Sequence, residues 1–294
     1  YDHSRDLLEL KPQYVHRKLC SIICQKQDKK LPPDYFTAIL SNAVAESEAV
    51  INSQAASSAR NITDFYRSES KMDEISLEDD AHNVLKFIIR SLEKWGRLMK
   101  TKEEKRLPEG MGGMRFEKSG KEFEGALVYD CKFTTKEEGY NLNMNEKRKA
   151  ADYIKIVKKI GALKSFGNKL SSYLILSNKV RPRQFKNFTE TVKKDAKWDG
   201  NMILITPKSL LKLYSTINGN FDKILGDYGK FQETLYSLIF RKRQTKSKRE
   251  YIELTDSAID SAFSYLTLKE LRDFPLPSKA EKQAIEIIHI TKNS

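Results

Sequence analysis

The fold is decided by one stretch of the sequence, RLPEGMGGMRFEKSGKEFEGALVYDCKF, which occupies residues 106–133. Its apolar run at 127–129 ends on the triplet Asp130, Cys131 and Lys132. Because a strand alternates its side chains, Asp130 and Lys132 project to one face and Cys131 to the other. The carboxylate can hold Mg²⁺, while the ammonium group can orient or activate a water molecule or offset charge on a phosphate. Such triplets are common on solvated strands, so this one gains meaning only from its surroundings.

The residues around the triplet predict a β-hairpin. It consists of a strand at 114–117, a turn at 118–121 and a return strand at 123–132. Upstream, Pro108, Glu109 and Gly110 place a second acid near the mouth of the hairpin. Downstream, residues 144–154 have the pattern of a helix. The sequence therefore predicts two acids and a lysine at one end of a hairpin.

This order of proline, acid, strand and acid-x-lysine resembles the PD-(D/E)xK nuclease superfamily. More narrowly, AspCysLysPhe at 130–133, GlyTyrAsnLeu at 139–142 and Tyr153 are similar to the FokI-type cleavage domain of type IIS restriction endonucleases. The resemblance spans residues 77–215 and implies a Mg²⁺-dependent endonuclease that hydrolyses DNA. It implies that Asp130 is the central metal ligand and Lys132 the water-orienting lysine. Cys131 would be a ligand through its backbone carbonyl.

Several residues are candidates for the first acid of this site. Glu109 best matches the acid that follows proline in the family, but the family's usual interval before Asp130 leads to Gly112 and Gly113. Either residues are inserted, which MetGlyGly would tolerate, or the acid is missing. Alternatives on the hairpin are Glu117, Glu122 and Glu124. We predict that this acid is Glu109, as the second metal ligand and a catalytic residue.

Composition limits the class of protein. The 294 residues carry a formal net charge of +13, which favours a polyanionic partner, nucleic acid before an acidic membrane. A merely soluble basic protein is the alternative. The three cysteines have no CxxC spacing and the four histidines are dispersed, which disfavours a disulfide framework or a zinc site. With no signal peptide or membrane-length apolar run visible, we expect an intracellular, prokaryotic, cytoplasmic protein without a membrane partner.

Three regions are predicted: a helical region or linker at 1–76, the nuclease core at 77–215 and a helical extension with a basic loop at 216–294. In the first region, helices are predicted at 14–27 and from Asp34 to Val44, and residues 43–59 are a helix or a loose connector. In the core, a helix at 77–95, capped at Ser76, is followed by the hairpin. Then come strands at 172–177 and 201–205 and helices at 181–197 and 207–214. This alternation predicts an α/β fold, a mixed β-sheet flanked by helices as in a restriction-endonuclease-like core. In the extension, helices are predicted at 231–240, 256–265 and 278–288.

DNA is the expected partner. The basic residues expected to hold its backbone are Lys179, Arg181, Arg183, Lys186, Lys193 and Lys194. The basic run at 241–249 is either a phosphate-contacting loop or a solvated tract. The acids at 78–80 supply either an accessory ligand or a favourable interaction with the helix dipole. The resemblance implies that two cleavage domains pair transiently as a homodimer; the alternative is a monomer that nicks. Two other functions remain open: a non-catalytic DNA-binding or dimerisation module with a decayed nuclease fold, and a nuclease for RNA or repair.

Overall fold

The structure is a computed structural model that describes residues 33–68, 74–95, 107–134, 136–159, 161–242 and 250–267. The chain divides into two compact units, Tyr1–Glu93 and Lys94–Ser294. The helices predicted at 14–27 and 278–288 lie outside the described residues. Within the described residues, no helix is long and apolar enough to cross a membrane.

The described residues of the first unit form two helices, α3 (Pro33–Ser68) and α4 (Glu74–Ile88), which pack against each other. The helix α3 is continuous, so the Ala- and Ser-rich residues 43–59 are helical and not a loose connector. Polar pairs join the two helices: Asn83 Nδ2 donates to Ser58 Oγ at 3.0 Å, and Asn61 Nδ2 donates to Asp80 Oδ1 at 3.2 Å. The contact with Asn61 gives buried Asp80 a structural role within this unit.

The prediction for α4 is wrong at both ends, because α4 begins at Glu74, before Ser76, and ends at Ile88, well before Trp95. The N–H of Ile89, directly after the helix, still donates to Leu85 O at 2.8 Å, and a turn follows. The Leu92 N–H donates to Ile89 O in a tight turn, and the Trp95 N–H donates to Glu109 O at 2.8 Å. Between them lies the short edge strand β1 (Glu93–Lys94). The boundary between the units accordingly falls at 93–94, whereas the sequence suggested 76.

The second unit is built on a six-stranded sheet with strand order β1-β2-β3-β4-β5-β6. After β1, the strands are β2 (Gly110–Lys118), β3 (Lys121–Cys131), β4 (Leu170–Leu176), β5 (Asn201–Ile205) and β6 (Ile252–Leu254). The strands β2 and β3 are antiparallel, whereas β3, β4, β5 and β6 run parallel to one another. The predicted α/β class and mixed sheet are therefore confirmed. The strand β6 was not predicted, since the extension was expected to be helical.

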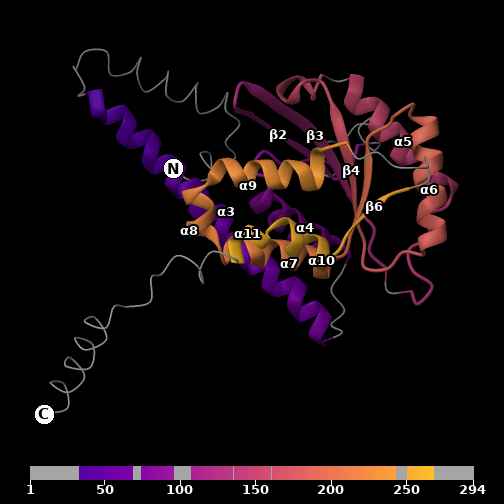
Figure 1. The fold of residues 1–294 in the computed structure, drawn as a ribbon. Helices are drawn as coiled ribbons and strands as arrows, with labels where there is room; N and C mark the ends of the chain where they lie inside the picture. The colour runs from indigo at the N-terminus through magenta and orange to yellow at the C-terminus, as the bar shows by residue number, and fades with distance from the viewer. Residues whose placement is uncertain are drawn as a thin grey trace, which may run out of the picture. The chain divides into compact units, whose positions relative to one another are not determined.

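Helices cover both faces of this sheet (Figure 1). One face carries α5 (Met144–Lys159) and α6 (Pro182–Asp195), whose apolar side chains share a buried core with Ala126 and Val128 of β3. The other helices are α7 (Pro207–Asn218), α8 (Phe221–Gly226), α9 (Tyr228–Leu235), the π-helical turn η3 (Tyr236–Phe240), α10 (Asp256–Ala262) and α11 (Ser264–Thr267). The turn η3 lies on the opposite face, where Ser172 Oγ donates to Ile239 O. The described residues at 217–242 and 250–267 therefore belong to the same unit as the sheet.

The β2–β3 hairpin is longer and more regular than the sequence suggested. Its pairing runs without interruption from Gly110↔Tyr129 to Lys118↔Lys121, so MetGlyGly lies inside β2 and contains no bulge. The turn residues Ser119 and Gly120 have φ values of 53° and 71°, as a two-residue hairpin turn requires. The residues between Gly110 and Tyr129 therefore form one regular hairpin and do not loop out at the glycines.

Gly113 is required by close packing, so we expect Gly113→Ala to destabilise the fold. An added Cβ would lie 2.5 Å from the backbone oxygen of Gly125 and 2.6 Å from the ring of Phe166, in the 3₁₀ turn η2 (Lys164–Phe166). Overpacking of this kind costs about 1–3 kcal/mol, which chemical denaturation measures. Gly229→Ala on α9 is the matched control, because nothing lies within 4 Å of its added Cβ. Equal stability of the two variants would contradict the assigned packing.

Candidate active site

Asp130 and Lys132 lie at the carboxyl end of β3, on the face covered by α5. The parallel strands β3, β4 and β5 bring their carboxyl ends to the same edge of the sheet. Lys132 follows the last residue of β3 but stays beside β4. Its N–H donates to Leu176 O at 2.8 Å, and Ser177 Oγ donates to Lys132 O at 2.5 Å. The backbone on both sides of the triplet is thereby held in place.

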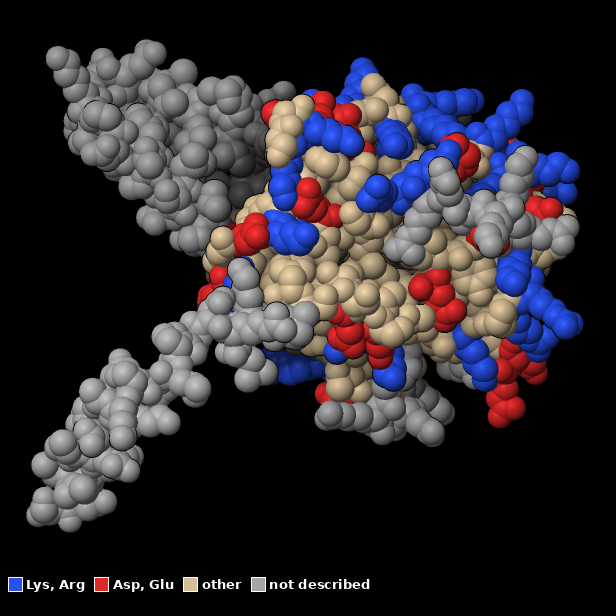
Figure 2. Space-filling view, viewed as in Figure 1, with Lys and Arg blue, Asp and Glu red and all other residues tan. Residues whose placement is uncertain are grey.

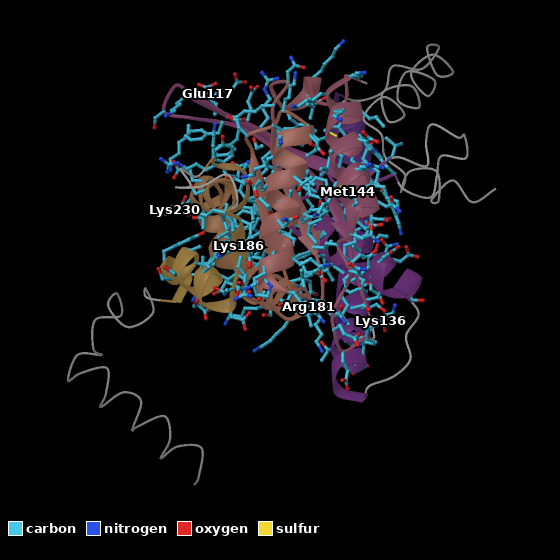
Figure 3. All side chains as sticks on the ribbon, turned by 90° about the vertical axis from the view of Figure 1, so that its right-hand side faces the viewer. Glu117, Lys136, Met144, Arg181, Lys186 and Lys230 are labelled. Carbon is cyan, nitrogen blue, oxygen red and sulfur yellow. The ribbon has the colours of Figure 1, made fainter. Side chains whose placement is uncertain are left out.

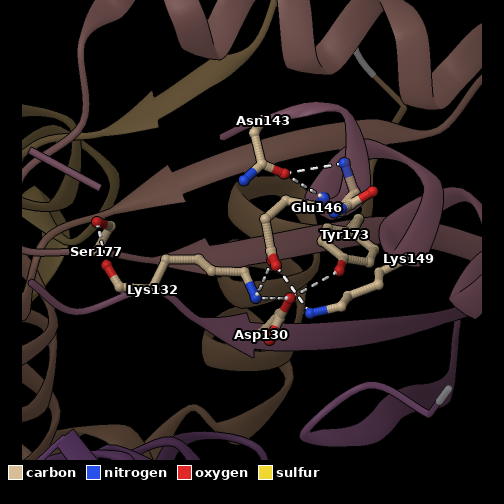
Figure 4. Close-up of polar contacts among 8 residues, drawn as sticks. Asp130, Lys132, Asn143, Glu146, Lys149, Tyr173 and Ser177 are labelled. Carbon is tan, nitrogen blue, oxygen red and sulfur yellow. Dashed lines mark hydrogen bonds and ion pairs between the residues drawn. The ribbon is translucent and has the colours of Figure 1, made fainter. Parts of the chain in front are cut away.

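The side chains form a buried ion-paired cluster with a third residue, Glu146 (Figure 4). Lys132 Nζ lies 2.8 Å from Asp130 Oδ2 and 2.9 Å from Glu146 Oε2. The exposed fractions of Asp130, Lys132 and Glu146 are only 3%, 7% and 8%. Charges this deeply buried require partners, and here each carboxylate faces the same ammonium group. We call these three residues the Asp–Lys–Glu cluster.

Glu146 was not predicted from the sequence. It stands in the first turn of α5, which Asn143 caps: Asn143 Oδ1 accepts from the N–H groups of Asn145 at 2.9 Å and Glu146 at 3.2 Å. An acid in the first turn of a helix ordinarily offsets the helix dipole, so nothing in the sequence pattern distinguished this one. The available signal was its position just after the GlyTyrAsnLeu segment that follows the triplet.

The electrostatics of the cluster keep it charged. Burial disfavours the charged form of Lys132, but the Asp130 carboxylate, with Tyr140 and Glu146, outweighs it and raises the Lys132 pKa. Burial likewise works against ionised Glu146, but Lys132 and then Lys149 outweigh it and lower the Glu146 pKa. Lys149 Nζ lies 2.9 Å from Glu146 Oε1 on the more exposed side. Lys132 therefore acts as a permanent cation at neutral pH.

Three tyrosines surround the cluster. Tyr173 on β4 donates from its hydroxyl to Asp130 Oδ2 at 3.2 Å. Burial, followed by the charge of Asp130, raises the pKa of both Tyr173 and Tyr153, so both remain neutral hydrogen-bond donors. The ring of Tyr140 lies with its centroid 5.6 Å from Lys132 Nζ, within the range of a cation–π contact.

Glu109 lies at the same edge of the sheet as the cluster. It comes one residue before Gly110, and Asp130 comes one residue after the partner of Gly110, Tyr129, so both acids stand at the same end of the hairpin. It is half-buried, and its charge contributes, after burial and the charges of Asp130 and Lys132, to the shift of the Tyr153 pKa. Glu109 is thus within electrostatic range of Tyr153, and its role as the second acid stays a prediction.

The other acids considered lie elsewhere. Glu117 is paired with Glu122 in the register near the turn of the hairpin, far along the strands from Asp130 (Figure 3). Glu122 and Glu124 form ion pairs with Arg115, at 2.6 Å and 3.1 Å. The interpretation of these three as alternative first acids is therefore wrong, because the hairpin places them at the opposite end of the strands.

The donor set fits a magnesium ion in its chemistry. In the part of the chain that the structure describes, no group of three or more His, Cys, Asp or Glu side chains is arranged to hold a metal. Mg²⁺, however, is usually held by one or two carboxylates together with water and substrate phosphate. The cluster offers two carboxylates, and buried Glu146 Oε2 makes its ion pair with Lys132 without a hydrogen bond of good geometry. Cys131 is buried, and alternation along β3 directs its thiol away from the cluster.

The structure separates the predicted DNA-binding residues along α6. Lys179, Arg181 and Arg183 follow the carboxyl end of β4, so they share the edge of the cluster, and all three are exposed. Arg181 Nε donates to Glu138 O at 2.8 Å. Lys186 is exposed one turn further along α6 (Figure 3). Lys193 and Lys194 occupy the last turn of α6, at the other end of the helix. Lys193 is also half-buried, and burial lowers its pKa.

Comparisons with known proteins gave few matches. A scan against protein-family models found no match, and a search of curated proteins found none. Among solved structures, the chain is similar to one described as the crystal structure of the small subunit (R.BspD6I2) of the heterodimeric restriction endonuclease R.BspD6I. The sequence identity is 15% and the TM-score 0.39, and the match covers 71% of this chain and 97% of that chain. A similarity this low does not support a functional assignment. The assignment of an active site therefore depends on the geometry of the Asp–Lys–Glu cluster.

Proposed function

We propose that the protein is a Mg²⁺-dependent endonuclease that hydrolyses DNA phosphodiester bonds, as the cleavage part of a restriction endonuclease. The observation that supports this most is the Asp–Lys–Glu cluster at the carboxyl edge of β3, with Glu109 at the same end of the hairpin. A buried lysine held between two acids is costly to maintain for stability alone. Its place on a sheet edge beside exposed arginines suits a phosphate substrate.

In this proposal the residues have distinct tasks. Asp130 and Glu146 would hold the Mg²⁺ ion, with Glu109 and the backbone carbonyl of Cys131 completing its surroundings. When bound, the ion polarises the phosphate and lowers the pKa of a coordinated water. Because its pKa is raised, Lys132 keeps its proton; it orients the attacking water and offsets negative charge on the phosphate. Tyr173 fixes Asp130 through its hydroxyl.

The substrate is tested by a panel of duplex DNA, single-stranded DNA and RNA of the same sequence. Purified protein with Mg²⁺ is expected to cut duplex DNA fastest and to lose activity in EDTA. Preferential cleavage of RNA would contradict the restriction role and indicate a nuclease that acts on RNA or in repair. Transient pairing of two cleavage domains stays a prediction.

A second candidate is a non-catalytic DNA-binding module with a decayed site. It is favoured by one observation: the Lys132 ammonium group already pairs with both buried carboxylates, Asp130 and Glu146. Under this alternative the protein would bind duplex DNA but leave every substrate of the panel intact at all Mg²⁺ concentrations.

The two ends of α6 should contribute differently to duplex binding. Arg183 lies in the first turn beside the proposed site, whereas Lys194 lies in the last turn of the same helix. We expect Arg183→Glu to reduce the slope of log K against log salt by at least about 0.9, the value for one lost phosphate contact. Lys194→Glu is the matched control and should leave the slope nearly unchanged. Fluorescence anisotropy in EDTA, between about 50 and 200 mM salt, measures both. The reverse ranking would place the DNA at the other edge of the sheet.

A further inference from the structure

A second basic groove lies away from the Asp–Lys–Glu cluster. It has a volume of about 910 Å³ and is lined by the start of β3, by Lys169 just before β4, by α9 with η3, and by α10. Since β3 and β4 begin here and end at the cluster, the groove occupies the opposite edge of the sheet. Its volume is in the range of ligand-sized pockets, about 300–1,000 Å³.

Cations dominate the lining, and the acids are already engaged. The basic residues of the lining are Lys121, Lys169, Lys230, Arg241 and Lys242, and all five are exposed. The two acids of the lining have partners outside it: Glu122 lies 2.6 Å from Arg115, and Glu233 lies 2.6 Å from Lys118. Lys242 is paired with Asp199. The remaining cations make the groove attractive to a polyanion. Figure 2 shows the Lys and Arg side chains on the face of the molecule that Figure 1 presents.

The groove also contains aromatic rings with fixed orientation. Phe123 stacks on Phe116 with centroids 4.9 Å apart, and Tyr236 meets Phe123 edge-on at 5.4 Å. Tyr236 donates from its hydroxyl to Glu124 O at 3.2 Å, which holds the ring in place. Phe123 and Tyr236 are only half-buried, so part of each ring is accessible from the groove. Lys121 Nζ lies 5.7 Å from the centroid of Phe123.

Half-exposed rings beside lysines and an arginine are the combination that single-stranded nucleic acid requires. The cations attract the phosphates, and the rings stack on unpaired bases, which a duplex keeps in its interior. We propose that this groove binds a single-stranded DNA segment of one to a few nucleotides, independently of the cleavage site. The proposal goes beyond the endonuclease function and does not rest on it.

The test is binding of a fluorescent oligothymidine to the full chain in EDTA, so that no cleavage step is involved. Lys121→Glu combined with Lys230→Glu reverses two exposed charges of the groove and should raise Kd at least about tenfold. Phe123→Leu keeps the site apolar but removes the ring, and should raise Kd at least about fivefold through lost stacking. Lys155→Glu combined with Lys158→Glu, on α5, is the matched control and should change Kd less than about twofold.

Three results would overturn this inference: an unchanged Kd in the lysine variant, an unchanged Kd in Phe123→Leu, or equal competition by a duplex of the same length. The second of these would reduce the groove to an unspecific basic surface. Circular dichroism of each variant establishes that it is folded. Asp130→Asn should bind the oligothymidine with the Kd of the wild type. The binding assay therefore tests the groove, and the separate cleavage assay tests the endonuclease proposal.

Discussion

Asp130→Asn is expected to lower Mg²⁺-dependent DNA cleavage by at least about 100-fold. Asparagine keeps the shape of the side chain and can still accept from the Tyr173 hydroxyl, but it removes the negative charge that would hold the metal. Metal ions supply several kcal/mol of transition-state stabilisation, and each 1.36 kcal/mol corresponds to about a factor of ten. Initial rates on supercoiled plasmid, at saturating Mg²⁺, measure the effect.

Asp152→Asn is the matched control for this change. Asp152 stands on α5 and pairs with Lys155 at 3.6 Å, but both side chains are substantially exposed. Removing its charge should leave the cleavage rate within about twofold, because exposed pairs of this kind contribute little. If Asp130→Asn cleaves at the rate of Asp152→Asn, the proposed metal ligand is wrong.

Lys132→Met is expected to cost about 3–5 kcal/mol of unfolding free energy at neutral pH, the usual cost of removing one partner from a buried ion pair. The change leaves Asp130 and Glu146 buried near each other without the ammonium group between them. The exposed fraction of Lys132, 7%, shows that a substitution tests stability as well as chemistry.

The cost should depend on pH. In the wild type the Glu146 pKa is lowered, so its stabilisation is present above the unfolded-state pKa, about 4.3, and is lost on acidification. In Lys132→Met, burial and the neighbouring Asp130 would instead raise the Glu146 pKa. A raised pKa favours folding at low pH and opposes it as pH increases. The stability difference between variant and wild type should therefore shrink from about pH 7.5 to about pH 4.5.

Urea denaturation at both pH values measures this difference. Lys155→Met, which removes the cation of the exposed pair on α5, should cost less than about 1 kcal/mol at either pH. A pH-independent loss in Lys132→Met would mean that the buried carboxylates do not depend on Lys132 for their charge.

The central strands could be predicted because their patterns are local. Alternation along β3 put Asp130 and Lys132 on one face, and the apolar runs of β4 and β5 between turn signals located those strands. The start of α5 at Met144 was also predictable. These features depend on neighbouring residues, so the sequence alone specifies them.

What could not be predicted depends on residues far apart in the chain. Glu146 joins Lys132 only because α5 folds back over the face of β3, and no local pattern records that contact. The short strand β1 after α4 was also missed, since the Trp95 N–H finds its partner, Glu109 O, only across a long separation in the chain. The basic residues from Lys179 to Lys194 looked like one cluster, but α6 has 14 residues and is about 21 Å long, so its two ends lie at different edges.

The most direct test of the proposed function is incubation of purified wild-type protein with supercoiled plasmid across a Mg²⁺ titration. The protein's Asp–Lys–Glu cluster predicts nicked and linear products that appear with Mg²⁺, disappear with excess EDTA and fall at least about 100-fold in Asp130→Asn. Intact plasmid at every Mg²⁺ concentration, with duplex binding retained, would contradict the endonuclease assignment and leave the DNA-binding module in its place.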